Sequence, residues 1–289
     1  MDDWSIWMLE YARCDVQPVP RVLYGEGYGK TAYFPFSFLL LVGKGHTALV
    51  DVGYDPEREF ISKLLHENAI TCSRDAPSVL SKVGIRPEAV DTIFVTHAHY
   101  DHMGNLPAFP NARVYLQTRE IERWEYALGM PSRFSALRES VDPADILYVR
   151  QLQEDGRLVL VDGVAQDVLP GIDLRPAFDS HTDGSQYVVI RNAEHTWVAT
   201  GDNMFSYANA ETTPSHPSYR GIGYGTGSLW RSLLVIDEML TIAGAVERLA
   251  IVHEGETFQR FPSVRTADSL AVSELCLARG AESRLPVTS

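Results

Sequence analysis

The chain has 289 residues, of which 45% are hydrophobic and 22% charged, and this ordinary globular composition excludes a disordered or fibrous protein. The 25 Lys and Arg residues against 38 Asp and Glu residues give a formal net charge of −13, and no basic cluster offsets it, which argues against a nucleic-acid partner. The three cysteines are widely spaced, the sequence has no secretory signal pattern, and its longest apolar run, residues 34–42, is too short to span a bilayer. We therefore expect a cytoplasmic protein without disulfides or membrane binding.

Apolar periodicity predicts a mixed α/β chain in which strands dominate the first third and helices are interleaved later. In chain order, we expect strands at 6–11, 36–42 and 47–51, helices at 57–67 and 76–83, strands at 92–96 and 113–116, a helix at 119–127, strands at 158–161, 187–191 and 196–200, a helix at 229–242, a strand at 249–252 and a helix at 266–278. No repeat or linker interrupts this order, so we expect a single domain over 1–289.

Several predicted strands end directly in a charged or metal-ligating residue: Asp51, His97, Asp202 and His253. Polar side chains at strand ends, followed by turns that contain glycine, are where α/β folds place functional groups. For Asp51, a role as a turn residue is an equally good interpretation.

The segment Phe94–His102 (FVTHAHYDH) brings four ligand-type residues together within six positions. Strand alternation places His97 and His99 on the same side, and Asp101 and His102 follow in a turn that enters a helix. Imidazole nitrogens and carboxylate oxygens are the donors that zinc and similar cations accept. A divalent cation would offset the cost of gathering these polar groups, so the segment predicts a metal site.

This segment is similar to the HxHxDH motif of the metallo-β-lactamase superfamily, which the sequence resembles from about residue 30 to 255. His181 lies in DSHTDGS, similar to the superfamily's GHTxGS turn with Ser180 in place of glycine. Asp202 ends ATGD, similar to the xGD strand end, and His253 lies in IVHEG, similar to the terminal xxHG with Glu254 inserted.

The resemblance implies a four-layer αβ/βα sandwich that holds two divalent metal ions. One metal would be bound by His97, His99 and His181, and the other by Asp101, His102 and His253, with Asp202 bridging them. Because no cysteine stands at a ligand position, the all-nitrogen-and-oxygen set favours zinc, and manganese, iron or cobalt are alternatives.

The closest resemblance is to the lactonase-like branch, which includes the acyl-homoserine lactonases and pyridoxolactonase. It implies a hydrolase that opens a small lactone, or a related cyclic ester or amide, by attack of a metal-bridging hydroxide, with Asp101 as proton shuttle. The alternatives are a mononuclear iron oxidoreductase of the persulfide dioxygenase type, or a thioesterase or linear ester hydrolase on the same site. The expected partner is a small-molecule substrate, and family resemblance also suggests a homodimer.

We expect two pocket-lining insertions rich in aromatic residues, near 20–36 and 204–230. Acyl-homoserine lactonases have a carbonyl-contacting tyrosine three residues after the bridging aspartate; here that position is Phe205, and Tyr207 follows. Glycines alternate from Gly221 to Gly227, which predicts a mobile or tightly turned lid. The candidate substrate contacts are Phe205, Tyr207, Tyr224 and His216, although these aromatic residues could instead pack in the core or at a subunit contact.

Overall fold

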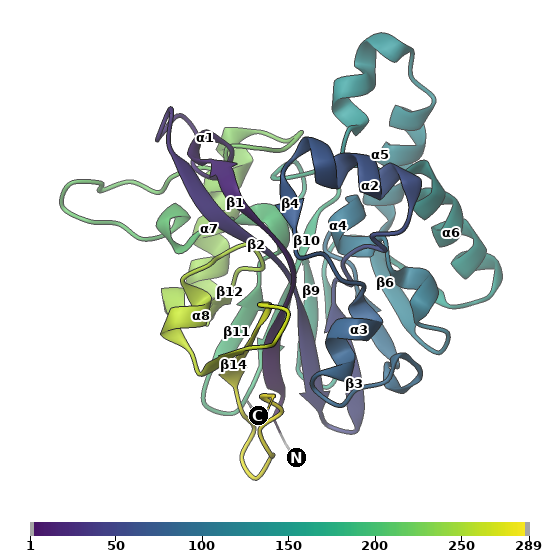
Figure 1. The fold of residues 1–289 in the computed structure, drawn as a ribbon, viewed down its shortest axis with the longest axis vertical. Coiled ribbons are helices and arrows are strands. Elements are labelled where there is room, and N and C mark those ends of the chain that lie inside the picture. Colours follow the sequence, from purple (N-terminus) through teal and green to yellow (C-terminus); the bar gives the residue numbers. More distant parts are fainter. Residues whose placement is uncertain (1–2, 287–289) are drawn as a thin grey trace.

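Two β-sheets packed face to face form the centre of the protein in the computed structural model, which describes residues 3–286 (Figure 1). Within these residues, the larger sheet has nine strands, and the smaller sheet has five. The larger sheet runs in the order β13 (Ser263–Arg265), β14 (Ala271–Cys276), β1 (Ser5–Pro18), β2 (Thr31–Gly43), β3 (His46–Val50), β5 (Thr92–Phe94), β6 (Arg113–Gln117) and β7 (Leu158–Val161), and β4 (Ile70–Thr71) pairs with β1. The smaller sheet runs in the order β12 (Leu249–Ala250), β11 (Thr196–Ala199), β10 (Gln186–Arg191), β9 (Ile172–Pro176) and β8 (Ala165–Leu169).

The helices of the described residues are α1 (Val19–Val22), α2 (Glu59–Glu67), α3 (Ala76–Ser81), α4 (Tyr100–Met103), α5 (Thr118–Leu128), α6 (Pro143–Glu154), α7 (Leu229–Ala243) and α8 (Thr257–Arg260). The longer helices cover the two outer faces of this pair of sheets, whereas Phe258 of α8 packs against the apolar cluster between the sheets. Figure 1 shows α2, α3, α5 and α6 on one side of the molecule and α7 and α8 on the other.

Strand alternation divides the buried apolar residues into three layers. Trp7 of β1 packs in a cluster with the residues of α2, α3, α5 and α6, whereas its neighbour Ile6 packs between the sheets. In β10, Val188 faces the larger sheet, and Val189 packs in a cluster with Met239 of α7. Because each sheet is buried on both faces, its central strands have nearly continuous apolar runs. The layers helix, sheet, sheet and helix confirm the predicted four-layer αβ/βα sandwich.

The parallel strands bring the polar strand ends to one rim of the sandwich. Strands β3, β5, β6 and β7 are parallel neighbours in the larger sheet, and β11 and β12 are parallel in the smaller one. Asp51 follows β3 and His97 lies shortly after β5, while Asp202 and His253 lie shortly after β11 and β12. The carboxyl ends of these strands therefore meet where open α/β folds bind their ligands.

The C-terminal element differs from its prediction. Instead of a helix at 266–278, the chain forms the antiparallel pair β13 and β14, and β14 also pairs with β1 along Ile6–Leu9. The helical prediction was wrong because a short apolar run with intermittent polar residues fits both periods, and pairing with a distant strand decides between them. Helix α6 was not predicted from the sequence, although Asp142 caps its first turn and Pro143 begins it.

The insertion expected near 20–36 is only partly a loop, since β2 already begins at Thr31. Among the described residues, no helix has the length and apolar character needed to cross a membrane.

Candidate metal centre

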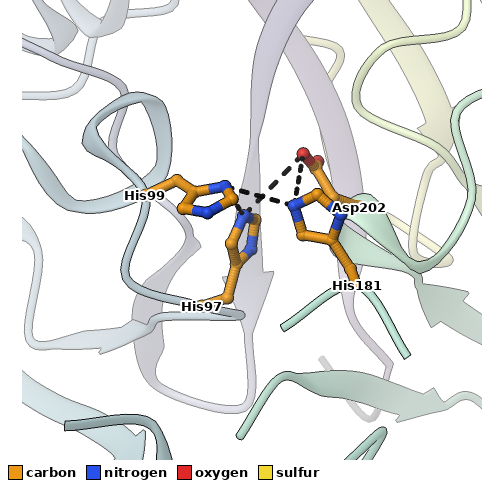
Figure 2. Close-up of side chains that lie close together, drawn as sticks. All are labelled: His97, His99, His181 and Asp202. Atoms are coloured by element: carbon orange, nitrogen blue, oxygen red, sulfur yellow. Dashed lines mark hydrogen bonds and ion pairs between the residues drawn. The ribbon is translucent and has the colours of Figure 1, made fainter. Parts of the chain in front are cut away.

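Three imidazoles and one carboxylate converge at the rim of the sandwich (Figure 2). His99 Nδ1 lies 3.0 Å from His97 Nε2 and 3.1 Å from His181 Nε2. Asp202 Oδ2 lies 3.7 Å from His97 Nε2 and 3.4 Å from His181 Nε2. All four side chains are buried. His181 joins the other two histidines although it is far from them in sequence. We call these residues group one.

A second convergence uses the other oxygen of Asp202. Its Oδ1 lies 3.1 Å from both His102 Nε2 and His253 Nε2. Asp101 Oδ2 lies 3.6 Å from the first of these nitrogens and 3.8 Å from the second. Asp101, His102, Asp202 and His253 form group two, and all are buried. Asp202 thus has one oxygen in each group, as a bridging ligand requires.

The donor atoms of both groups fit divalent cations. Within each group the ligand atoms lie within 4.8 Å of one another. Three buried atoms of group two have no hydrogen-bond partner among the described residues: His102 Nε2, Asp202 Oδ1 and His253 Nε2. An unsatisfied buried polar atom costs about 1–3 kcal/mol, so three that face one another need a common partner. A cation with a preference for nitrogen and oxygen ligands supplies one.

Neighbouring groups fix the ring orientation of four of the five histidines through Nδ1. His102 Nδ1 lies 2.8 Å from Asp51 Oδ2, and His253 Nδ1 lies 2.8 Å from the carbonyl oxygen of Pro35. His97 Nδ1 contacts Thr96 Oγ1 at 3.0 Å, and His181 Nδ1 contacts the carbonyl oxygen of Tyr224 at 3.1 Å. These contacts leave Nε2 free to face the centre, as partners of metal-bound histidines usually do.

Asp51 is therefore more than a turn residue. Its Oδ1 accepts the Thr96 main-chain N–H at 2.8 Å, and its Oδ2 accepts the Thr96 hydroxyl at 2.9 Å, beside its contact with His102. Asp51 has a positive φ of 63° just after β3, a conformation that is uncommon for a residue other than glycine. The sequence left this residue undecided, and its place beside His102 supports the functional interpretation.

Burial keeps the imidazoles of group one in the neutral form that binds metals. Burial lowers the pKa of His97 and of His99 well below the usual range. It also lowers the pKa of His181 to about 4. At neutral pH all three rings therefore offer a nitrogen lone pair.

A cavity of about 570 Å³ opens above the two groups. Its floor consists of His99, Asp101, Asp202 and His253, and its nearest walls are aromatic: Phe34, Phe36, Tyr100, Phe205 and Tyr224. The outer walls come from α2, through Phe60 and Leu64, and from the segment 135–140. These outer walls were not predicted from the sequence, because the amphipathic pattern of a helix does not show whether the helix lies beside the metal ligands.

Two of the four candidate substrate contacts line this cavity, and two do not. Phe205 and Tyr224 are lining residues. Tyr207 is 1% exposed and packs against the α7 layer, with its hydroxyl 3.2 Å from Thr257 Oγ1. His216 is exposed in a turn closed by backbone hydrogen bonds with Thr213. Contrary to expectation, neither Tyr207 nor His216 lies at this cavity: a short 3₁₀ turn directs Tyr207 into the core, and His216 lies on a surface loop.

The glycine-rich segment 221–227 packs tightly on the turn that carries His181. Thr226 N donates to the His181 carbonyl oxygen, and Ser228 N donates to that of Asp179, both at 2.8 Å. Gly227 lies between these two hydrogen bonds, where a Cβ would be 1.8 Å from the Ser180 carbonyl oxygen. Of the two interpretations offered by the alternating glycines, the structure supports a tightly turned segment.

A second cavity, of about 660 Å³, adjoins the first. Both cavities are lined by Phe34, Phe205 and His253, which we call the aromatic partition. The rings of Phe34 and His253 are stacked with centroids 4.3 Å apart, and Phe205 lies 5.8 Å from His253. Glu254, Glu256 and Arg265 are the charged residues that line the second cavity.

Comparisons with known proteins agree with this geometry. The family model described as the metallo-beta-lactamase superfamily matches residues 32–241. An anti-Pycsar protein, Apyc1, from Paenibacillus xerothermodurans is 21% identical over 208 residues, which cover 66% of this chain and 78% of that protein. An N-acyl homoserine lactonase from Bacillus cereus is 26% identical over 156 residues, which cover 54% of this chain and 52% of that protein.

Solved structures show the same fold at low sequence identity. An N-acyl homoserine lactone hydrolase, with the product N-hexanoyl-L-homoserine bound at its catalytic metal centre, has a TM-score of 0.65 at 20% identity and covers 91% of this chain and 98% of its own. AidC, a dizinc quorum-quenching lactonase, has a TM-score of 0.63 at 16% identity, with 92% of each chain covered.

Proposed function

Because the chain belongs to the metallo-β-lactamase superfamily and is a metal-dependent hydrolase, we propose that it opens a small lactone, or a related cyclic ester or amide, at a centre of two zinc ions. The observation that carries this proposal is the division of Asp202 between the two ligand groups at the floor of the cavity. His97, His99 and His181 would hold one cation, and Asp101, His102 and His253 the other. The lactonases among the structural neighbours, one of them described as a dizinc enzyme, support the same choice.

Two divalent cations, when bound, lower the pKa of a coordinated water and polarise a substrate carbonyl. The remaining work falls to side chains of this chain. Asp101 is the best placed of them to move a proton, because its carboxylate lies at the cavity floor and Oδ2 faces His102 and His253. The Tyr11 hydroxyl donates to the main-chain oxygen of Asp101 at 2.7 Å and holds this residue in place. We propose that Asp101 takes a proton from the attacking water and delivers it to the leaving oxygen or nitrogen.

The cavity walls suit a flat ring better than a polymer. Phe34, Phe36 and Phe205 provide apolar surfaces beside the metal ligands, and a volume of about 570 Å³ is of the size that small-molecule pockets have. Tyr224 closes one side of the cavity, where its hydroxyl lies 2.9 Å from Ser140 Oγ. We propose that Tyr224 orients the ring by stacking or by hydrogen bonding, and that Phe205 contributes only apolar contact.

The test is a substrate panel assayed with protein purified without chelator and, separately, with zinc-loaded and with iron-loaded protein, with oxygen uptake recorded. The panel contains aliphatic and aromatic lactones, cyclic amides, linear esters, thioesters and glutathione persulfide. We expect ring opening of at least one lactone without oxygen consumption. Turnover of the persulfide alone, with oxygen consumed, would overturn the hydrolytic proposal, whereas turnover of thioesters alone would retain hydrolysis and discard the ring.

Asp101→Asn tests the proton transfer. The variant should lose more in kcat than in KM, and a substrate with a leaving group of lower pKa should recover part of the loss because it needs less protonation. Asp162→Asn removes an exposed carboxylate and serves as the matched control. An equal loss for good and poor leaving groups would refute the assignment of the proton shuttle.

A further inference from the structure

A buried carboxylate outside both ligand groups connects the two chain segments that carry the three histidines of group one. Glu120 is 0% exposed and is the third residue of α5. Its Oε1 accepts the Ala98 main-chain N–H at 2.8 Å, and Ala98 lies between His97 and His99. Its Oε2 accepts the Thr182 hydroxyl at 2.8 Å and the Gly184 main-chain N–H at 2.9 Å, next to His181.

A fourth donor completes the environment of this carboxylate. The Trp124 indole N–H donates to Oε1 at 2.8 Å, and the Trp124 ring lies 5.7 Å from that of His99. All four partners act as donors, which is the environment that an ionised carboxylate requires. A glutamate in the first turn of a helix commonly accepts a hydrogen bond from the residue that caps its own helix. Both carboxylate oxygens of Glu120 instead accept hydrogen bonds from other chain segments and from Trp124.

The turn that carries His181 also contacts the backbone of α5 directly. A Cβ at Gly184 would lie 2.2 Å from the Glu120 main-chain nitrogen, so the two backbones touch. Outside this contact, Arg119 and Arg123 form ion pairs with Asp183 of the same turn. The first two turns of α5 thus hold the His181 turn from its buried side and from its exposed side.

We propose that Glu120 is a positioning residue that sets the distance between the His97–His99 segment and the His181 turn, and so shapes group one for its cation. The inference rests on the proposed dinuclear function and goes beyond it in one respect: the two cations depend differently on Glu120. The hydrogen bonds of Glu120 reach the segments of His97, His99 and His181, and none of its four donors belongs to Asp101, His102, Asp202 or His253. Loss of the carboxylate should therefore weaken one metal site selectively.

The experiment compares Glu120→Gln with the wild-type protein. Glutamine keeps the size of the side chain but turns an amide NH₂ toward two of the four donors. We expect the affinity for Zn²⁺, titrated into metal-free protein, to fall by about 10- to 100-fold at one site and to change little at the other. With Co²⁺ as the only metal, the visible spectrum should lose the contribution of one cobalt at concentrations that saturate both wild-type sites.

Two further variants keep the inference testable. Glu125→Gln removes a carboxylate from the exposed face of the same helix, where Glu125 pairs with Arg150, and should leave both affinities as in the wild type. If Glu120→Gln does not fold, Thr182→Val removes one of the four hydrogen bonds without changing the size of the side chain, and should weaken the same site by a smaller factor.

The outcomes separate this inference from the proposed function. Wild-type protein that binds two ions, together with a variant in which both sites weaken equally or neither weakens, would overturn the role of Glu120 alone. Wild-type protein that binds fewer than two ions would overturn the dinuclear function, and this inference with it.

Discussion

Gly227→Ala tests whether the segment 221–227 holds the His181 turn in place. In the native structure the Cβ of an alanine would lie 1.8 Å from the Ser180 carbonyl oxygen and 2.4 Å from that of Asp179. Both are main-chain atoms, so no side-chain rotation can relieve the contact. The two chain segments must move apart instead.

The size of the effect follows from these distances. Ordinary contact begins near 3.4 Å, so the segments must separate by more than 1 Å. That movement breaks the hydrogen bonds from Thr226 N to His181 O and from Ser228 N to Asp179 O, both 2.8 Å long. Each contributes about 1 kcal/mol net, so we expect a loss of about 1–3 kcal/mol in the free energy of unfolding. A displacement of about 1 Å at a ligand can also lower kcat/KM by about 100-fold.

The assays are urea unfolding of the metal-free protein, Zn²⁺ titration and kcat/KM on any lactone that the wild type opens. Gly129→Ala is the matched control, because its Cβ would make ordinary contact at 3.5 Å and its φ of −78° suits alanine. This control should unfold within about 0.5 kcal/mol of the wild type. A Gly227→Ala protein with wild-type stability and wild-type metal affinity would refute the argument.

Three other predictions concern separate parts of the chain. Burial raises the pKa of Asp145 to about 6, against the pull of its hydrogen bond to Arg58. The protonated form is therefore favoured by folding, and this group's contribution to stability is lost as the pH rises through about 6. The free energy of unfolding of Asp145→Asn, measured with urea relative to the wild type, should therefore rise by up to about 3 kcal/mol between about pH 4 and pH 8. A difference that does not change with pH would contradict this. Tyr224→Ala removes a cavity wall but keeps the main-chain oxygen that faces His181. We therefore expect KM to rise by about tenfold and the affinity for Zn²⁺ to stay unchanged. Loss of metal would show that the Tyr224 side chain supports the centre. His181→Ala should lower activity by about 100-fold or more. His195→Ala, on an exposed turn, should change activity little, and equal effects of the two substitutions would contradict the assignment of His181 as a metal ligand.

The parts of the site that could be predicted from the sequence are those in which several ligand-type residues lie close together, at a recognisable spacing, in one short segment. The FVTHAHYDH stretch specifies a strand, a turn and four ligand-type residues, and the structure brings those four side chains to one rim. His181, Asp202 and His253 were found because each follows a strand in a turn similar to those of a known family. The structure places all seven residues in two touching groups.

What could not be predicted depends on contacts between distant segments. Glu120 lies in an ordinary amphipathic helix, and nothing in its surroundings in the sequence indicates that its carboxylate reaches both Ala98 and Gly184. The strand β14 is fixed by pairing with β1 at the opposite end of the chain. Tyr207 was misjudged because the direction of a side chain in a short 3₁₀ turn depends on what packs beneath it, here the α7 layer.

The aromatic partition has a consequence for how the substrate range of this protein can evolve. Of its three members, only His253 belongs to a ligand group, so Phe34 and Phe205 can change without removing a metal ligand. A smaller side chain at either position would join two separate spaces into one longer chamber beside the same catalytic floor. Truncation of a buried phenylalanine to alanine costs about 3–5 kcal/mol, but a step to leucine costs less and opens part of the passage. The second cavity therefore lies behind a single layer of rings, and few substitutions would be needed for a bulkier substrate to reach it.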